Sequence, residues 1–571
     1  MILSAAGVLI AAAAAAAAIL LAPGRLRAAA MLLALVLFPV LIAGDQWHSP
    51  QITDVRDEPL QLIALGAVAL IGALALAAVF DRWPLLLPLA IVAALPFRVP
   101  LEAGGDTANL LVPLYLVIAG GVLSTCFAEW RGAGGSRSDA GIFAGRVATL
   151  AEFPLRKSGR RTRPGPPGPP SADVAGFLPW VLAGVAVLYA LQTLYSPDFS
   201  KSLQNVCFFF VPFSLVYALL RDVRWTKELL RYVLLVIAVE AVAFVLVGSV
   251  EYVTRELFWN DQVIRSNEFH SYFRVNSIFW DPNIYGRYLA LVIVIAMAAL
   301  LWIRERKAFA LLTALVAVLW LGLAPTFSQS SFIALLVGLA VLAAIRWSWR
   351  WTLAAVAAGA VLAVVIVIFA GGVSKLSPDR LNVDTGGRTN LISGGTDLFA
   401  KRPLWGYGAG SFPRAYREQV ATKKTPVAVS HTEPVTVAAE QGLIGLLSYA
   451  ALIAVALWTM SAGLGSMGGA GGVQSSAASR FSPRDVSESR DAPGENPSTR
   501  LDTPGDSPPS VARAAVLAAF VALLVHTFAY AAFYEDPIAW VLLAAGASLA
   551  GTGSTAFAFS RAVADKQRTR D

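Results

Sequence analysis

A histidine and two glutamates stand at the start of a long apolar segment. The stretch SHTEPVTVAAEQGLIGLL, residues 430–447, contains His431, Glu433 and Glu440 ahead of a hydrophobic run. A charge inside a bilayer is costly and usually functional, and a buried carboxylate needs a cation or a hydrogen-bond network. An imidazole can accept a proton near neutral pH. We therefore predict a polar cluster here, although His431 can equally cap the helix or remain solvated.

The segment before this histidine, residues 371–433, is basic, with nine Lys or Arg against five Asp or Glu. A basic surface beside the membrane suits an anion such as a lipid phosphate or pyrophosphate. Arg388 begins an apolar-periodic run, so its guanidinium and the free N–H groups of a helix N-terminus can bind an anion together. Arg402 and Arg414 are further candidates, unless these side chains are solvated or touch lipid headgroups.

A second polar segment, residues 250–282, leads into the sequence HSYFRVNSIFWDPNIYGRYL. Its His270 and Arg274 are four residues apart, which places them on one face if this stretch is helical. The WDPN turn predicts the start of the next helix, with Pro282 in the first turn. Arg287 follows soon after, where it either binds substrate or snorkels to the membrane interface.

The composition indicates that these polar groups belong to a membrane protein. Of 571 residues, 57% are hydrophobic and only 14% are charged, and the mean hydropathy is +0.63. Runs of about 18 or more apolar residues recur, each long enough to cross a bilayer core of about 30 Å. We predict an all-α, polytopic transmembrane helical bundle of about 12–15 spans. The segment 84–96 is short and flanked by prolines, so it is expected to be tilted or re-entrant.

The basic residues divide the chain by membrane side. Lys and Arg concentrate in alternate loops, which predicts that 129–175 and 462–512 are cytoplasmic and that 371–433 is a large extracytoplasmic loop. Both cytoplasmic segments are rich in Gly, Pro, Ser and mixed charge, so we expect them to be disordered. The predicted regions are N-terminal helices (1–128), a basic loop (129–175), central helices (176–370), the extracytoplasmic loop (371–433), one helix (434–461), an insert (462–512), and C-terminal helices with a tail (513–571).

Several function classes receive no support. The net charge of +8 comes from loops beside the spans, so nucleic acid is not a predicted partner. Cys126 and Cys207 lie in apolar segments, which argues against a disulfide framework or a thiolate metal site. No histidine pair or carboxylate run has metal-ligand spacing, and no cofactor is predicted. The glycine-rich GYGAGSF (406–412) lacks the strand context of a nucleotide-binding loop and is predicted to be a tight turn.

Five stretches, in this order, resemble the O-antigen ligase and O-antigen polymerase superfamily. They are FRVNSIFWDPNIYGRYLAL, PTFSQSSFIALLVG, GRTNLISGGTDLFAKRPLWGYGAGSF, SHTEPVTVAAEQGLIGLLSYAALI and HTFAYAAFYEDPIAWVLLAAGASL. The resemblance covers residues 270–460 and 526–549. It implies a GT-C-like glycosyltransferase of the bacterial inner membrane that works on the extracytoplasmic side without a metal.

The resemblance also implies partners and roles. Such enzymes move a glycan from an undecaprenyl-pyrophosphate carrier to a lipid-linked acceptor or a growing glycan, among membrane lipids. By resemblance, Arg274 and Arg388 engage the pyrophosphate, and His431 acts as the base or orients the acceptor. Attack by a sugar hydroxyl needs its proton accepted and the leaving charge held. The additional candidate substrate contacts are Arg287, Arg402, Glu440, His270 and Arg414.

Three alternatives stay open. Ligase and polymerase would share the same loop and differ in their acceptor. A lipid-linked glycan flippase or a solute transporter should show inverted repeats and polar groups at mid-membrane, whereas here no internal repeat is evident and polar residues gather at one face. A catalytically inactive scaffold of the same fold is the third alternative.

Overall fold

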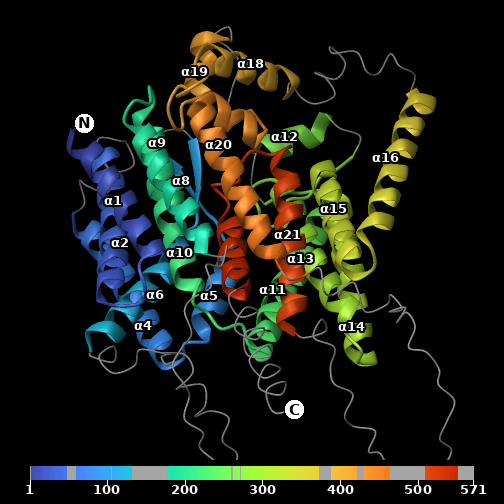
Figure 1. The fold of residues 1–571 in the computed structure, drawn as a ribbon, viewed down its shortest axis with the longest axis horizontal. Helices are drawn as coiled ribbons and strands as arrows, with labels where there is room; N and C mark the ends of the chain where they lie inside the picture. Colours follow the sequence, from blue (N-terminus) through green and yellow to red (C-terminus); the bar gives the residue numbers. More distant parts are fainter. Residues whose placement is uncertain are drawn as a thin grey trace, which may run out of the picture.

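The computed structural model describes residues 2–47, 59–103, 106–131, 176–258, 261–269, 272–371, 388–420, 430–462, 464 and 508–550. Within these ranges the chain is almost wholly helical, and most helices stand side by side in one bundle (Figure 1). Eleven of the described helices are long and apolar enough to cross a membrane, and two shorter apolar ones are Phe177–Thr193 and Pro537–Ala550. The predicted all-α polytopic bundle is confirmed.

The N-terminal half supplies one side of the bundle. Its helices are α1 (Ile2–Leu20), α2 (Arg25–Asp45), α4 (Pro59–Arg82), α5 (Leu86–Ala94), α6 (Val112–Trp130), α8 (Phe177–Thr193), α9 (Phe199–Asn205), α10 (Val211–Leu220) and α11 (Lys227–Thr254). A π-helical turn, Val206–Phe210, joins α9 to α10. These helices are apolar on nearly every face, as expected where one side meets protein and the other meets lipid.

The C-terminal half carries most of the predicted site residues. Its helices are α12 (Asp261–Phe269), α13 (Pro282–Trp302), α14 (Arg306–Leu323), α15 (Gln329–Arg346), α16 (Trp349–Gly371), α18 (Arg388–Lys401), α19 (Phe412–Gln419), α20 (Glu433–Ser461) and α21 (Pro508–Thr527). α13, α15 and α21 pack against one another. The short helices α12, α18 and α19 lie at the end of the bundle where α20 begins (Figure 1).

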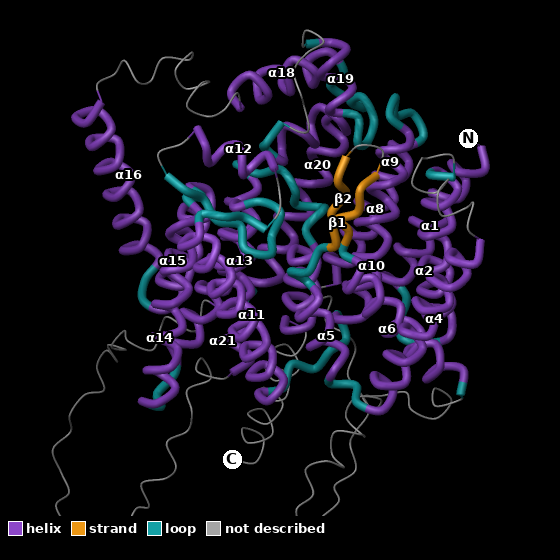
Figure 2. The backbone as a smooth tube through the Cα atoms, turned by 180° about the vertical axis from the view of Figure 1, so that it is seen from behind, coloured by secondary structure: helices purple, strands orange, loops and turns teal. Residues whose placement is uncertain are grey.

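The segment 84–96 does not form an ordinary span. Its helix α5 has nine residues, about 14 Å of helix, which is half the thickness of a bilayer core. An antiparallel hairpin follows, in which β1 (Val99–Ala103) pairs with β2 (Asp106–Leu110), Val99 opposite Leu110. The hairpin lies in the half of the bundle nearer to α18 and α19 (Figure 2). The sequence predicted the short segment but no strand.

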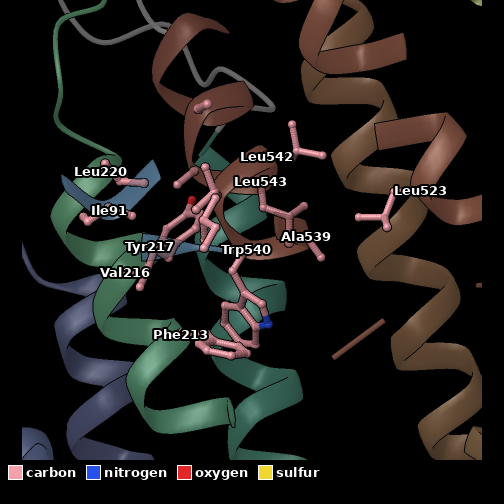
Figure 3. Packing of buried hydrophobic residues seen from close by; sticks show 14 of the residues in the cluster. Ile91, Phe213, Val216, Tyr217, Leu220, Leu523, Ala539, Trp540, Leu542 and Leu543 are labelled. Atoms are coloured by element: carbon pink, nitrogen blue, oxygen red, sulfur yellow. The ribbon is translucent and has the colours of Figure 1, made fainter. Parts of the chain in front are cut away.

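Aromatic side chains join the C-terminal segment to the N-terminal half. Trp540 and Phe213 are almost fully buried, and their ring centroids lie 6.2 Å apart in an edge-to-face arrangement (Figure 3). The indole nitrogen of Trp540 donates a hydrogen bond to the main-chain oxygen of Tyr534 at 3.1 Å. Because buried aromatics contribute a large apolar area, this packing fixes the loop 528–536 against the bundle.

Some predictions fall beyond the described residues. The segments 129–175 and 462–512, predicted to be disordered, lie outside them except at their edges, where α6 extends to Trp130 and α21 begins at Pro508. His270 is also outside the described residues.

Candidate functional site

The glycine-rich segment 406–412 packs against a kink in α20. Gly406, Gly408 and Gly410 all have positive φ, and so does Gly442 inside α20. A Cβ on Gly406 would overlap the carbonyl group of Glu440. Only glycine allows this approach without strain, and it lets the Gly408 N–H bond the Glu440 carbonyl at 2.7 Å. The turn predicted from GYGAGSF is therefore confirmed.

Two glutamates of α20 hold neighbouring loops in place. Both carboxylate oxygens of Glu440 accept main-chain N–H groups, from Gly410 and from Phe412, each at 2.9 Å. One oxygen of Glu433 accepts the N–H of Phe533 at 3.1 Å. Both side chains are buried. Their geometry positions α19 and the C-terminal loop, whereas the sequence had suggested a cluster with His431.

Arg274 lies in the loop after α12. The helix ends at Phe269, so the stretch is not helical at Arg274 and the condition for a shared helical face is not met. Its Nε donates to the Thr326 carbonyl at 2.9 Å, and its Nη2 donates to Oδ1 of Asn283 at 3.1 Å. The side-chain amide of Asn267 bonds the main-chain N–H and carbonyl of Arg274, both at 3.0 Å. These bonds hold both the main chain and the guanidinium group of Arg274, so the group has a fixed orientation.

Two carboxylates support the same loop. One oxygen of Glu251 accepts the N–H groups of Asn276 and Ser277, at 3.1 and 2.7 Å. Ser277 has φ 51°, a left-handed conformation that these bonds stabilise. Asp281 then caps α13, its Oδ1 accepting the Asn283 N–H at 2.6 Å, and Pro282 occupies the first turn as predicted.

Four of these residues converge at the same end of the bundle. Arg388 is the first residue of α18, as predicted, and His431 precedes α20 with φ 62°. Burial lowers the pKa of His431; nearby Arg388 lowers it further, and Asp281 opposes both. Burial likewise lowers the pKa of Arg274, which also interacts with Asp281 and Arg388. We call Arg274, Asp281, Arg388 and His431 the outer cluster.

A second polar group lies deeper, between α13 and α21. Arg287 is only 2% exposed, and its Nη2 pairs with Oδ2 of Asp536 at 2.9 Å. Its guanidinium carbon is 6.0 Å from the ring centroid of Tyr530. Buried His526 contacts the Ser330 hydroxyl at 3.2 Å. Arg287 therefore does not snorkel to the interface. Arg98 interacts electrostatically with Arg287, Tyr530, Glu535 and Asp536. We call this set, together with His526, the inner network.

Two predicted arginines lie apart from the outer cluster. Arg402 follows α18, whose fourteen residues extend about 21 Å from Arg388. It stacks over the Tyr407 ring at 4.5 Å and lines a surface pocket of about 610 Å³ with Trp405. Arg414 is exposed and bonds the Glu418 carboxylate at 2.9 Å and the Pro197 carbonyl.

The comparison with known families includes part of the outer cluster. Residues 314–450 match the family described as O-antigen ligase. This region of the chain is similar to O-antigen ligase domains. The matched region includes α15, α18 and the first half of α20, and with them Arg388 and His431, so the resemblance read from the motifs is confirmed. Among curated proteins, none matches the chain.

The matched region thus contributes Arg388 and His431 to the outer cluster, whose side chains can bind an anion and accept a proton. The outer cluster contains two guanidinium groups and one carboxylate, which leaves positive charge for an anion. A histidine with a lowered pKa is a neutral imidazole at pH 7 and can accept a proton. Within the described ranges, no group of three or more His, Cys, Asp or Glu side chains is arranged to hold a metal ion.

Sequence reasoning missed several members of these groups. Asp281 was named only as part of a turn, although an Asp before Pro-Asn is a strong helix-cap signal. Arg98, His526, Tyr530 and Asp536 reach Arg287 from distant segments. The YEDP sequence around Asp536 is polar within an apolar region, which is the one signal that could have marked it.

Proposed function

We propose that this protein is a glycosyltransferase that moves a glycan from an undecaprenyl-pyrophosphate carrier to a lipid or glycan acceptor. The observation that carries the proposal is the convergence of Arg274, Arg388 and His431 next to Asp281, with two of them inside the region similar to O-antigen ligase domains. Three of the four are the residues that the family resemblance marks for catalysis.

The proposed reaction is a single displacement. An acceptor hydroxyl oxygen bonds to the anomeric carbon while the bond from that carbon to the pyrophosphate oxygen breaks. The electron pair leaves with the polyprenyl pyrophosphate, and the hydroxyl proton passes to the His431 imidazole. Attack from the face opposite the leaving group inverts the configuration. Arg274 and Arg388 hold the developing phosphate charge through planar, paired donors.

The arrangement of the bundle supports an extracytoplasmic site in the bacterial inner membrane. α12, α18 and α19 gather at one end (Figure 1), and the described connections 221–226 and 303–305, which contain or border Lys and Arg residues, join helices at the other end. A site at the membrane surface lets the carrier keep its polyprenyl chain in lipid while the glycan extends into water.

Purified protein in lipid nanodiscs tests the proposal. It would be incubated with a synthetic undecaprenyl-pyrophosphate oligosaccharide, and release of undecaprenyl pyrophosphate would be followed by mass spectrometry. Transfer to a lipid A–core acceptor identifies a ligase, and a ladder of longer glycans identifies a polymerase. Donor that crosses proteoliposome membranes without release of pyrophosphate would instead identify a flippase and contradict the proposal.

A further inference from the structure

Arg287 is a buried guanidinium that lacks part of its hydrogen bonding. Its Nη2 pairs with Asp536 at 2.9 Å, while its Nε and Nη1 are buried and have no hydrogen-bond partner among the described residues. Buried donors are almost always satisfied in proteins. Two donors on one rigid, planar group therefore call for oxygen acceptors that another molecule supplies.

The unsatisfied donors lie close to the outer cluster. Arg274 bonds the side chain of Asn283, and Asn283 and Arg287 are four residues apart on α13, so they share one face about a turn apart. Tyr530 interacts electrostatically with both Asp281 and Arg287. The inner network thus continues the polar surface of the outer cluster toward the membrane interior.

The outer cluster and the inner network differ in net charge. The outer cluster contains two guanidinium groups, those of Arg274 and Arg388, and a single carboxylate, that of Asp281. In the inner network, Arg98 interacts with the carboxylates of Glu535 and Asp536, and Arg287 pairs with Asp536, so two guanidinium groups stand beside two carboxylates. A pyrophosphate is favoured where positive charge is in excess. The balanced inner network instead suits an uncharged ligand that is rich in oxygen.

Aromatic rings flank the same donors. The rings of His526 and Tyr530 have centroids 5.8 Å apart, and the Arg287 guanidinium lies over Tyr530. Tyr530 and Arg98 are partly exposed, so the network reaches the protein surface through them. Flat apolar faces beside paired hydrogen-bond donors fit a sugar ring with its hydroxyl groups.

We propose that the inner network is the acceptor subsite, in which Nε and Nη1 of Arg287 donate to hydroxyl oxygens of an uncharged sugar. This inference rests on the proposed glycosyltransferase function and names the class of acceptor. A site that hydrogen-bonds hydroxyl groups rejects ligands that lack them strongly, because its own buried groups are then unpaired.

Two soluble probes test the subsite: methyl glucoside, an uncharged sugar, and the corresponding methyl glucuronide, which carries a carboxylate. Binding to the purified protein is measured without donor by saturation-transfer NMR, so the result does not depend on turnover. The neutral probe should bind at least about tenfold more tightly than the uronide. Arg287→Gln should weaken the neutral probe by a similar factor, while Arg417→Gln, on the exposed face of α19, should change nothing.

Asp536→Asn provides a readout that a purely structural role would not give. It leaves the inner network with one excess positive charge, so the preference for the neutral probe over the uronide should fall several-fold. Equal binding of both probes to the wild-type protein, or an unchanged preference in Asp536→Asn, would overturn the inference.

A third variant covers a possible failure of Arg287→Gln to fold. Tyr530→Leu removes the flat ring face and should also weaken the neutral probe, whereas unaltered probe binding would count against the subsite. The KM for the lipid-linked donor should stay within about twofold in every variant, and a rise there in parallel with lost probe binding would assign Arg287 to the pyrophosphate instead. Failure of the wild-type protein to release undecaprenyl pyrophosphate would refute the glycosyltransferase function and leave the probe result standing by itself.

Discussion

Nη2 of Arg274 donates to Oδ1 of Asn283 at 3.1 Å, and this bond joins the loop after α12 to the first turn of α13. A second bond, from Nε to the Thr326 carbonyl at 2.9 Å, holds the same guanidinium from the other side. The guanidinium group of Arg274 is therefore held in one orientation before any ligand binds. Such preorganisation is what allows charged groups to stabilise a developing charge without first rearranging.

Replacement of His431 should abolish most transfer. His431 has φ 62°, a conformation that asparagine tolerates better than other residues, so His431→Asn removes the imidazole with little added backbone strain. The rate should fall by about 10²–10⁴, the usual contribution of a general base, while donor binding is kept. Single-turnover release of undecaprenyl pyrophosphate measures the effect, and wild-type turnover in this variant would exclude His431 as the base.

The pH profile should report the environment of His431. The base must be neutral, so activity is lost as the pH falls through its pKa in the folded protein. Burial and Arg388 lower that pKa from the ordinary value of 6.5, so the acidic limb of kcat/KM should have its midpoint below 6.5. Asp281 opposes the shift, and Asp281→Asn should therefore move the midpoint to still lower pH. A midpoint above 6.5, or a move upward in Asp281→Asn, would contradict this placement.

Lysine should not replace arginine at position 388. An ammonium group cannot reproduce the planar, two-pronged contact of a guanidinium with phosphate. Arg388→Lys should thus lose nearly as much rate and donor affinity as Arg388→Ala, and Arg274 should behave in the same way. The exposed Arg417→Lys is the matched control and should behave like the wild-type protein. Full activity in Arg388→Lys would show that only charge is needed there.

Glu251 should act through the loop that it holds. Glu251→Ala leaves the buried N–H groups of Asn276 and Ser277 without their acceptor, at a cost of about 1–3 kcal/mol each. The loop 272–281 should then become more sensitive to proteolysis, and turnover should drop with it. Glu251→Gln keeps an acceptor oxygen and should retain much of both. Equal losses in the two variants would mean that the charge, rather than the hydrogen bonds, matters.

The sequence by itself determined the features that depend on neighbours along the chain. Apolar runs predicted the spans, the WDPN sequence predicted the start of α13, and the pattern after Arg388 predicted the start of α18. The glycines of 406–412 predicted a turn. Each of these rests on local preferences: hydropathy over a bilayer thickness, helix capping and glycine's access to positive φ.

Only the tertiary structure decided which distant residues meet. It bonded Glu440 to the main chain of the glycine-rich turn, placed Arg274 in a loop rather than on a helix, and paired Arg287 with Asp536. It also formed the hairpin after α5, whose strands the sequence analysis did not predict. Helices that are apolar on nearly every face contain no periodic signal for their packing partners. The neighbours of each buried polar group are therefore set by how the helices pack and by the need to satisfy every buried charge.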